Sequence, residues 1–289
     1  MAKPVTVFSG VLGLNNREHP SRLEADERGN VELAEAVNID ISNRGKPRRR
    51  KGQTRTPMTA ACHSFFDAGD YGLAVSGSSL LLVVPDFSTS VLRGGLQADR
   101  PMSYCKMAGK VFYANGYQHG YIEDQVDHVW GQATYSAADT SRVLSAPPLG
   151  HKLAAAFGRV WIAQDGVLWF TEGFSPFLCD MGRNAIPFDS RIMEVIPVRD
   201  GLFVSTMTQI VFLAGTKPED MYQEPIADYF IIPGTAVMAN IEDVPGVANN
   251  AGSSRICVAT TNEGVCILGA GGMYQNITNT KLVFPERYS

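Results

Sequence analysis

The densest group of charged side chains in this sequence lies just before residue 52. Five of the six positions from 46 to 51 are basic: Lys46, Arg48, Arg49, Arg50 and Lys51. Such a run can contact phosphates, pair with an acidic neighbouring subunit, or stay solvated with its alkyl stems over apolar surface. Pro47 cannot donate a backbone hydrogen bond, so it predicts an edge strand. No aromatic rings are interleaved with these cations, which argues against nucleic acid as the partner. Two interpretations remain: a solvated edge, or a subunit interface formed by Arg48, Arg49, Arg50 and Lys51.

The residues that carry most enzyme chemistry show no productive spacing. None of the five histidines has H-E-x-x-H or H-x-H spacing, so we expect them on the surface or in packing contacts: His19, His63, His119, His128 and His151. Glu123, Asp124 and Asp127 share one segment but lack the alternating pattern of a calcium loop. A local cluster also does not place two carboxyl groups across a cleft, as a glycosidase requires. No G-x-S-x-G elbow or phosphate-binding loop occurs. We therefore expect no enzyme activity, no cofactor and no metal ion.

The cysteines indicate buried thiols rather than disulfides. Their number is odd and none forms a C-x-x-C pair: Cys62, Cys105, Cys179, Cys257 and Cys266. Free cysteine behaves as a small apolar residue, and unpaired thiols suit assembly in a reducing cytoplasm.

The elements that would position these residues are short strands. The 289-residue chain has 28 Gly and 16 Pro, and only 19% of its residues are charged, a balance that favours turns and strands over long helices. The net charge of −4 gives no argument for nucleic-acid binding. No apolar run approaches the ~20 residues that cross a bilayer, and the first residues lack the apolar core of a signal peptide. We expect no membrane anchor.

One pattern recurs five times along the chain. Each copy is an apolar strand, a tight polar turn and a second apolar strand, at 73–83, 111–122, 160–170, 202–213 and 256–268. The turn centres lie about 40 to 55 residues apart, which brackets the ~40–50-residue repeat of four-stranded propeller blades. Asn115-Gly116 and Asp165-Gly166 are two-residue hairpin signals that predict a positive φ at Gly116 and Gly166. The apolar runs are near-continuous, as expected for strands buried on both faces.

Further strand candidates extend the repeats toward four-stranded blades. First strands are expected at 62–67, 102–107, 152–157 and 192–198, and weaker outer strands at 90–93, 128–130, 224–226 and 273–278. The sequence therefore predicts an all-β fold, a β-propeller of about five blades in residues 61–289. A β-sandwich or barrel with similarly spaced hairpins is the alternative.

Residues 1–60 differ from the repeats and are predicted to form an extended N-terminal arm. Residues 8–16 are rich in Gly and Asn, which favours turns. A strand candidate at 33–41 then leads through a turn at Gly45 into the basic strand, so we expect a basic hairpin.

This arm resembles the opening of tailed-bacteriophage virion proteins that have a propeller body. The matching positions are Leu33, Ala36, Asn38, Asp40, Gly45, Arg49, Arg50 and Gly52, and the run 271–278 resembles the closing blade of such proteins. The resemblance implies a structural role in a phage tail, tail tip, neck or adsorption apparatus, with host attachment among its possible duties. It also implies symmetric oligomers, contact with tail tube, hub or neck proteins, and a virion location after assembly in the host cytoplasm.

Two other functions stay open on the residues alone. A receptor- or carbohydrate-binding propeller could stack sugar rings on Trp130, which is expected near a loop, whereas Trp161 and Trp169 lie inside strands and are expected in the core. A glycan-cleaving propeller is the least favoured, because paired carboxylates are lacking.

Overall fold

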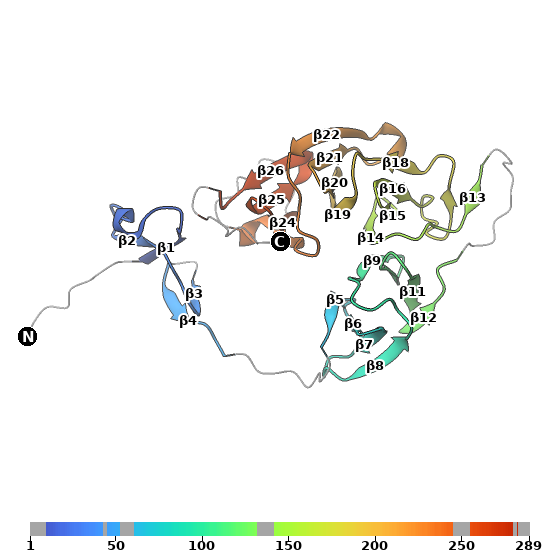
Figure 1. The fold of residues 1–289 in the computed structure, drawn as a ribbon, viewed down its shortest axis with the longest axis horizontal. Coiled ribbons are helices and arrows are strands. Elements are labelled where there is room, and N and C mark those ends of the chain that lie inside the picture. The colour runs from blue at the N-terminus through green and yellow to red at the C-terminus, as the bar shows by residue number, and fades with distance from the viewer. Residues whose placement is uncertain are drawn as a thin grey trace, which may run out of the picture. The chain divides into compact units, whose positions relative to one another are not determined.

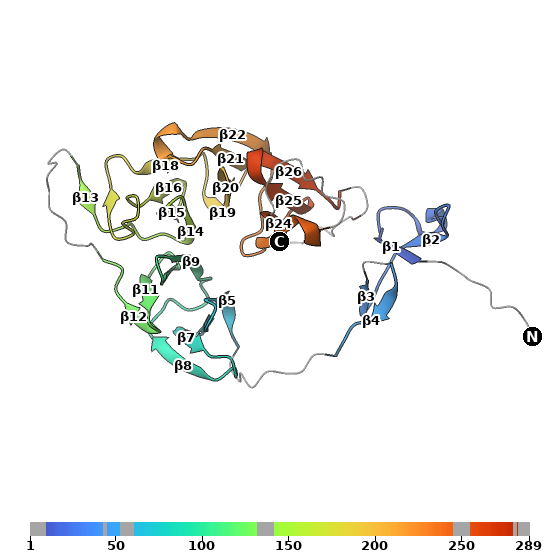
Figure 2. The ribbon, with the colours of Figure 1, turned by 180° about the vertical axis from the view of Figure 1, so that it is seen from behind.

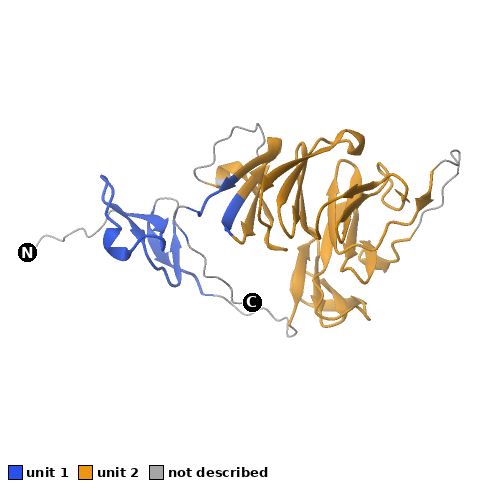
Figure 3. Cartoon of the chain, turned by 45° about the horizontal axis from the view of Figure 1, so that its top comes forward, with its two compact units in different colours: residues 1–55, 263–266, 275–289 blue, residues 56–262, 267–274 orange. Residues whose placement is uncertain are grey.

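The chain divides into two compact units in the computed structural model, and the described residues are 10–42, 45–52, 61–131, 142–244, 255–279 and 282. Unit 1 holds residues 1–55, 263–266 and 275–289, and unit 2 holds residues 56–262 and 267–274 (Figure 3). The first boundary lies near the expected residue 60. The grouping of two C-terminal segments with the arm is a feature that no sequence pattern indicated.

Five four-stranded antiparallel sheets follow one another along the chain (Figures 1 and 2). Blade 1 consists of β5 (His63–Asp67), β6 (Gly72–Ser76), β7 (Ser79–Val83) and β8 (Thr89–Arg93). Blade 2 consists of β9 (Ser103–Met107), β10 (Lys110–Ala114), β11 (His119–Glu123) and β12 (Val126–His128). Blade 3 consists of β14 (Lys152–Ala156), β15 (Arg159–Gln164), β16 (Val167–Phe170) and β18 (Ala185–Pro187). A small sheet of β13 (Leu144–Ser145) and β17 (Cys179–Asp180) accompanies it.

The last two blades complete the series. Blade 4 consists of β19 (Ile192–Val198), β20 (Gly201–Thr206), β21 (Ile210–Ala214) and β22 (Tyr222–Ala227). Blade 5 consists of β23 (Val237–Asn240), β24 (Arg255–Thr261), β25 (Gly264–Gly269) and β26 (Met273–Asn276). Short 3-10 turns lie at η1 (Pro20–Arg22), η2 (Pro218–Asp220), η3 (Ile241–Asp243) and η4 (Ala270–Gly272). The predicted all-β propeller of about five blades is confirmed. No helix in the described part of the chain is long and apolar enough to cross a membrane.

The core lies between the blades, which explains the continuous apolar runs. Leu73 and Val75 of blade 1 pack with Val111 and Ile122 of blade 2 in one cluster. Further clusters join blade 2 to blade 3 and blade 3 to blade 4, and their buried members include Phe112 with Ile162, and Trp161 with Leu202. Both faces of an inner sheet are covered, so alternation of apolar and polar residues is lost.

Serine hydroxyls tie neighbouring blades together. Ser64 Oγ accepts a hydrogen bond from the Met102 amide of the next blade at 2.9 Å, and Ser103 Oγ accepts one from the Leu153 amide at 2.9 Å. Ser205 Oγ accepts one from the amide of Ile231, in the segment that leads to blade 5, at 2.8 Å. In each case a side chain satisfies a backbone donor that lies outside its own sheet.

The structure corrects several local expectations. Trp130 is buried at 1% exposure, and its indole Nε1 donates to the carbonyl of Pro176 at 2.8 Å, so it cannot stack on a sugar. Cys62 is exposed because it precedes β5, whereas the other four cysteines are buried as expected. The outer strand expected at 128–130 lies at Val126–His128, and β18 and β23 were not expected from the sequence.

Unit 1 contains the arm and has two small sheets of its own. β1 (Gly10–Leu14) pairs in parallel with β2 (Asn30–Leu33), and β3 (Ile39–Ile41) pairs in antiparallel with β4 (Pro47–Arg49). The predicted basic hairpin is therefore present. The Arg17 guanidinium donates to the Asn279 carbonyl, so residues near the two ends of the chain meet within this unit.

Candidate functional site

The basic hairpin presents its cations to solvent. Arg48, Arg49, Arg50 and Lys51 are all exposed, and β3 and β4 contain no buried residue. Arg50 Nε lies 3.2 Å from Asp40 Oδ1, an exposed ion pair that contributes little to stability. The other three cations make no ion pair with the described residues. Arg49 and Lys51 border a shallow hollow of about 370 Å³, whose other lining residues are Asn38, Arg50 and Gly52.

Gly45 sets the turn of this hairpin. Its φ is +70°, and its amide donates to Ser42 at 2.8 Å. Its carbonyl accepts from the amide of Val11 at 2.7 Å, and a Cβ there would stand 2.9 Å from the Val11 carbonyl oxygen. The predicted role of Gly45 is confirmed, with a close approach of two backbones as an added reason for glycine.

The other two predicted turns differ from each other. Gly116 has φ +86° as predicted, but it lies in a four-residue loop between β10 and β11 that the Asn115 side chain closes by accepting from two loop amides. Gly166 lies in a two-residue loop, yet the positive φ of +50° belongs to Asp165 and not to Gly166. The prediction for Gly166 is wrong because only the first central residue is left-handed, as in a type II′ turn rather than a type I′ turn.

A larger hollow lies where the inner strands of blades 2, 3 and 4 begin, and we call it the axial hollow. Its volume is about 500 Å³, and its lining includes Arg100, Tyr117, His151, Lys152, Gln164, Asp165 and Arg191. Tyr117 is 51% exposed, and the Arg100 guanidinium carbon lies 5.2 Å from the centre of its ring. An aromatic residue in a hairpin loop was the one sequence signal for this hollow, because its other residues are far apart in the chain.

A buried ion pair supports the wall of the axial hollow. Lys152 Nζ on β14 lies 2.7 Å from Glu194 Oε2 on β19, and the two side chains are 16% and 9% exposed. The amide of Gly234 donates to the same carboxylate oxygen at 3.0 Å. Removing one member of such a pair leaves an uncompensated charge, so this arrangement fixes blade 3, blade 4 and the approach to blade 5.

His151 also joins two blades. Its Nε2 lies 2.7 Å from the Ile192 carbonyl oxygen, so Nε2 carries the proton and donates it. Burial lowers the pKa of His151 and outweighs the opposing effect of the Ile192 bond. The ring is therefore neutral at neutral pH and serves packing rather than charge.

In the acidic segment of Glu123, Asp124 and Asp127, two of the carboxylates make structural contacts. Glu123 pairs with Lys110, and Asp127 accepts from the Tyr113 hydroxyl at 2.6 Å. Burial is the main cause that raises the pKa of Tyr113, which keeps this hydroxyl a donor. Among the residues that the structure describes, no group of three His, Cys, Asp or Glu is placed to hold a metal ion.

Comparisons with known proteins yield structural likenesses only. No family model matches the chain and no curated protein matches it. Two crystal structures show the extracellular domain of one B. thetaiotaomicron protein, described as a one-component system and as a hybrid two-component system. The first is 8% identical over 77% of this chain, with a TM-score of 0.47. The second is 12% identical over 76% of this chain, with a TM-score of 0.48. The chain spans only 29% and 28% of those two structures. The WD40 β-propeller domain of Doa1 is 9% identical over 75% of this chain and 68% of its own, with a TM-score of 0.45.

Proposed function

We propose that this protein is a non-enzymatic structural component of a tailed-bacteriophage particle, in the tail, tail tip or neck, and that it joins other virion proteins through the basic hairpin. The exposure of that hairpin carries the proposal. All three residues of β3 and all three of β4 are exposed, including Ile39 and Ile41 at 37% each. An isolated pair of strands is marginally stable in water and gains stability when a further strand or a packed face covers it.

The charge of the hairpin indicates the kind of partner. Arg49 lies opposite Ile39 across the hairpin, and Arg48 lies opposite Asp40. One face of the hairpin therefore combines the exposed Ile39 and Ile41 with a cation that makes no ion pair with the described residues. A partner protein with an acidic rim around an apolar patch complements it, and such charges steer association. The resemblance to phage propeller proteins covers this same segment, and it supplies the virion as the setting.

The test compares charge reversal on the hairpin with reversal elsewhere on unit 1. Arg48→Glu combined with Arg49→Glu should lower incorporation into purified particles by roughly tenfold or more, because each lost charge pair at an interface costs on the order of 1–3 kcal/mol. Arg22→Glu combined with Arg28→Glu changes the net charge equally on other exposed residues of unit 1 and should incorporate normally. Mass spectrometry of the particles measures both, and circular dichroism checks folding.

Deleting the arm is a less clean test. Removing residues 1–52 also removes Arg17, which donates to Asn279, so lost assembly would have two explanations. Absence of the protein from purified particles, or equal incorporation of the two charge-reversal variants, would refute the proposal.

The axial hollow favours a second candidate, a receptor- or carbohydrate-binding propeller. Tyr117 offers a half-exposed ring beside Arg100, and Gln164 adds an amide. In this case Tyr117→Ala should abolish glycan-array binding, whereas Tyr222→Ala, which removes a ring that is 59% exposed outside the hollow, should not. If the unmodified protein binds no glycan on the array, that result counts against this candidate.

A further inference from the structure

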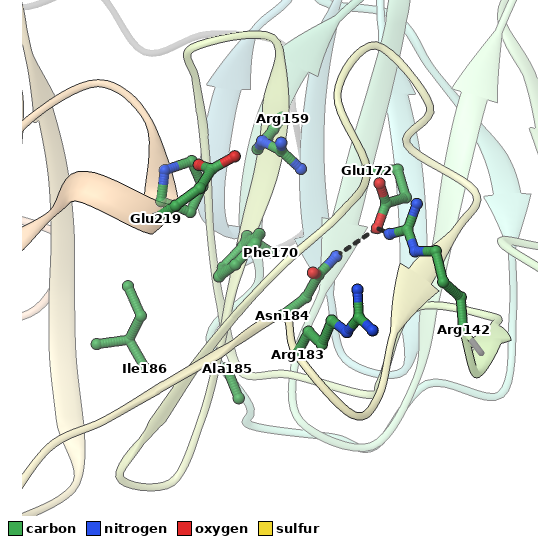
Figure 4. Close-up of a pocket in the computed structure, with 10 residues that line it drawn as sticks. Arg142, Arg159, Phe170, Glu172, Arg183, Asn184, Ala185, Ile186 and Glu219 are labelled. Carbon is green, nitrogen blue, oxygen red and sulfur yellow. Dashed lines mark hydrogen bonds and ion pairs between the residues drawn. The ribbon is translucent and has the colours of Figure 1, made fainter. Parts of the chain in front are cut away.

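Three arginines line a cleft of about 450 Å³ at the outer part of blade 3, and we call it the arginine cleft (Figure 4). Arg142 precedes β13, Arg159 begins β15, and Arg183 lies in the turn between β17 and β18. The rest of the lining consists of Phe170, Glu172, Asn184, Ala185, Ile186, Pro218 and Glu219. Neither the arm interface nor the axial hollow includes any of these residues.

Arg142 is already neutralised by two carboxylates. Its Nε lies 3.1 Å from Asp180 Oδ2, and its Nη2 pairs with Glu172 Oε1. Asn184 Nδ2 donates to the same Glu172 oxygen at 2.8 Å. Figure 4 shows this Glu172 carboxylate turned toward Arg142 and Asn184. Glu172 and Asp180 are therefore both held by Arg142, and Asp180 interacts with Arg183 only at longer range.

Arg159 and Arg183 lack a carboxylate partner. Within the described residues, neither has an acidic oxygen within 4.0 Å. Arg159 is nevertheless held in place, because its Nη1 donates to the Thr171 carbonyl at 2.7 Å and its guanidinium carbon lies 5.4 Å from the centre of the Phe170 ring. In Figure 4 its guanidinium lies above Phe170 at the upper side of the cleft.

The turn that carries Arg183 is also fixed. The Gly182 amide donates to Asp180 Oδ1 at 3.0 Å, and the amides of Arg183 and Asn184 donate to the Asp180 carbonyl at 3.1 and 2.8 Å. The Arg183 side chain is exposed, and Figure 4 shows its guanidinium between Asn184 and Arg142. The backbone of the turn is thus set before any ligand arrives, which lowers the cost of binding.

The geometry points to a binding site for a small organic anion, whose carboxylate or phosphate is held by Arg159 and Arg183. A guanidinium presents a planar fork of N–H donors that matches these oxyanions. The lining also includes the apolar side chains of Ala185, Ile186 and Pro218, so the ligand carries a ring or alkyl part beside its anionic group. This inference does not rest on the proposed virion role.

Glu219 makes it possible to test whether the arginine cleft binds an anion or a cation. It is exposed on η2, lines the cleft, and makes no ion pair with the described residues. Its carboxylate opposes an anion in the cleft, so Glu219→Gln should tighten anion binding. If the cleft instead bound a cation, the same substitution would weaken binding.

Ligand-observed NMR titrations at constant ionic strength test the proposal with benzoate and phenyl phosphate as probes and benzamide as the uncharged control. We expect saturable binding of at least one anion. Benzoate alone would assign the carboxylate, phenyl phosphate alone the phosphate, and either result supports the site. Arg183→Gln, which alters an exposed side chain, should weaken binding roughly tenfold or more, because a charge-assisted hydrogen bond contributes about 1.5–3 kcal/mol.

Matched variants decide between a site and general attraction. Arg28→Gln removes an equally charged, exposed arginine of unit 1 that lines none of the hollows described and should leave the affinity unchanged. Glu219→Gln should raise it about two- to fivefold, in the range of one partly screened charge. Arg159→Gln should also weaken binding, with thermal unfolding as the check on folding. Absence of saturation with both anions, equal binding of benzamide, or equal losses in Arg183→Gln and Arg28→Gln would overturn the proposal.

Discussion

Replacing Ser103 by alanine would test how the blades are joined. Ser103 is 8% exposed, and its hydroxyl is the acceptor for the amide of Leu153, which is 5% exposed. The substitution leaves a buried N–H without its partner. An unsatisfied buried donor costs about 1–3 kcal/mol, and we expect about 2 kcal/mol here. For a unit of this size, that corresponds to a fall in melting temperature of about 4–8 °C.

The assay is equilibrium denaturation followed by tryptophan fluorescence, supported by calorimetry. Ser78→Ala is the control, because Ser78 is exposed, and it should change stability by less than about 0.5 kcal/mol. Ser205→Ala should cost a similar amount to Ser103→Ala, since its hydroxyl accepts from the buried amide of Ile231. The two losses should add in the double variant, because they lie at different blade interfaces. If Ser103→Ala matches Ser78→Ala, the hydroxyl does not satisfy the Leu153 amide in the way described.

Three further predictions follow from burial and backbone geometry. Cys62 is exposed while the other four cysteines are buried, and burial raises the pKa of Cys179 to about 12. A thiol reagent should therefore modify one cysteine in the native protein and all five after denaturation. Rapid modification of more than one cysteine in the native state would contradict this. Burial lowers the pKa of His119 and of His151 from 6.5, so the folded state binds protons less readily than the unfolded chain. The contribution of these neutral rings to stability is therefore complete above pH 6.5 and is lost as the pH falls through their folded pKa values. His119→Gln combined with His151→Gln should therefore reduce the loss of unfolding free energy as the pH falls below about 6.5, and an unchanged slope would exclude these rings as the cause. Gly116→Ala should cost about 1–3 kcal/mol because its φ is +86°, and Gly166→Ala should cost less because it needs no left-handed backbone; denaturation midpoints in the reverse order would show that contacts, and not φ, decide.

The inner strands could be predicted because burial on two faces leaves a strong local signal. Ile192–Val198 is a run of mainly β-branched residues, and the strand has these bounds in the structure. β18 could not be predicted, since Ala185–Pro187 is short, contains Pro, and borders solvent. Trp130 was misplaced because its burial depends on the distant Pro176 and on Phe112, to which sequence spacing gives no clue.

Whether a site could be predicted also depended on how close its residues lie in the sequence. The basic hairpin could be found because its cations are adjacent in the chain. The axial hollow and the arginine cleft could not, because their residues lie between 100 and 233 and between 142 and 219 and meet only through the arrangement of the blades. Arg159 in particular reads as an ordinary turn residue between two strands.

The hydrogen bond between Arg17 and Asn279 determines the order in which parts of the chain can fold during synthesis. Each blade is built from strands close in sequence, so blades 1 to 4 can fold soon after they leave the ribosome. The arm contact spans 262 positions and forms only after residue 279 has been translated. A chain that stops after blade 4 would keep the interfaces among its blades but would lack the segment that Arg17 contacts. The contact of the arm with Asn279 thus forms only after the strands of all five blades have been translated.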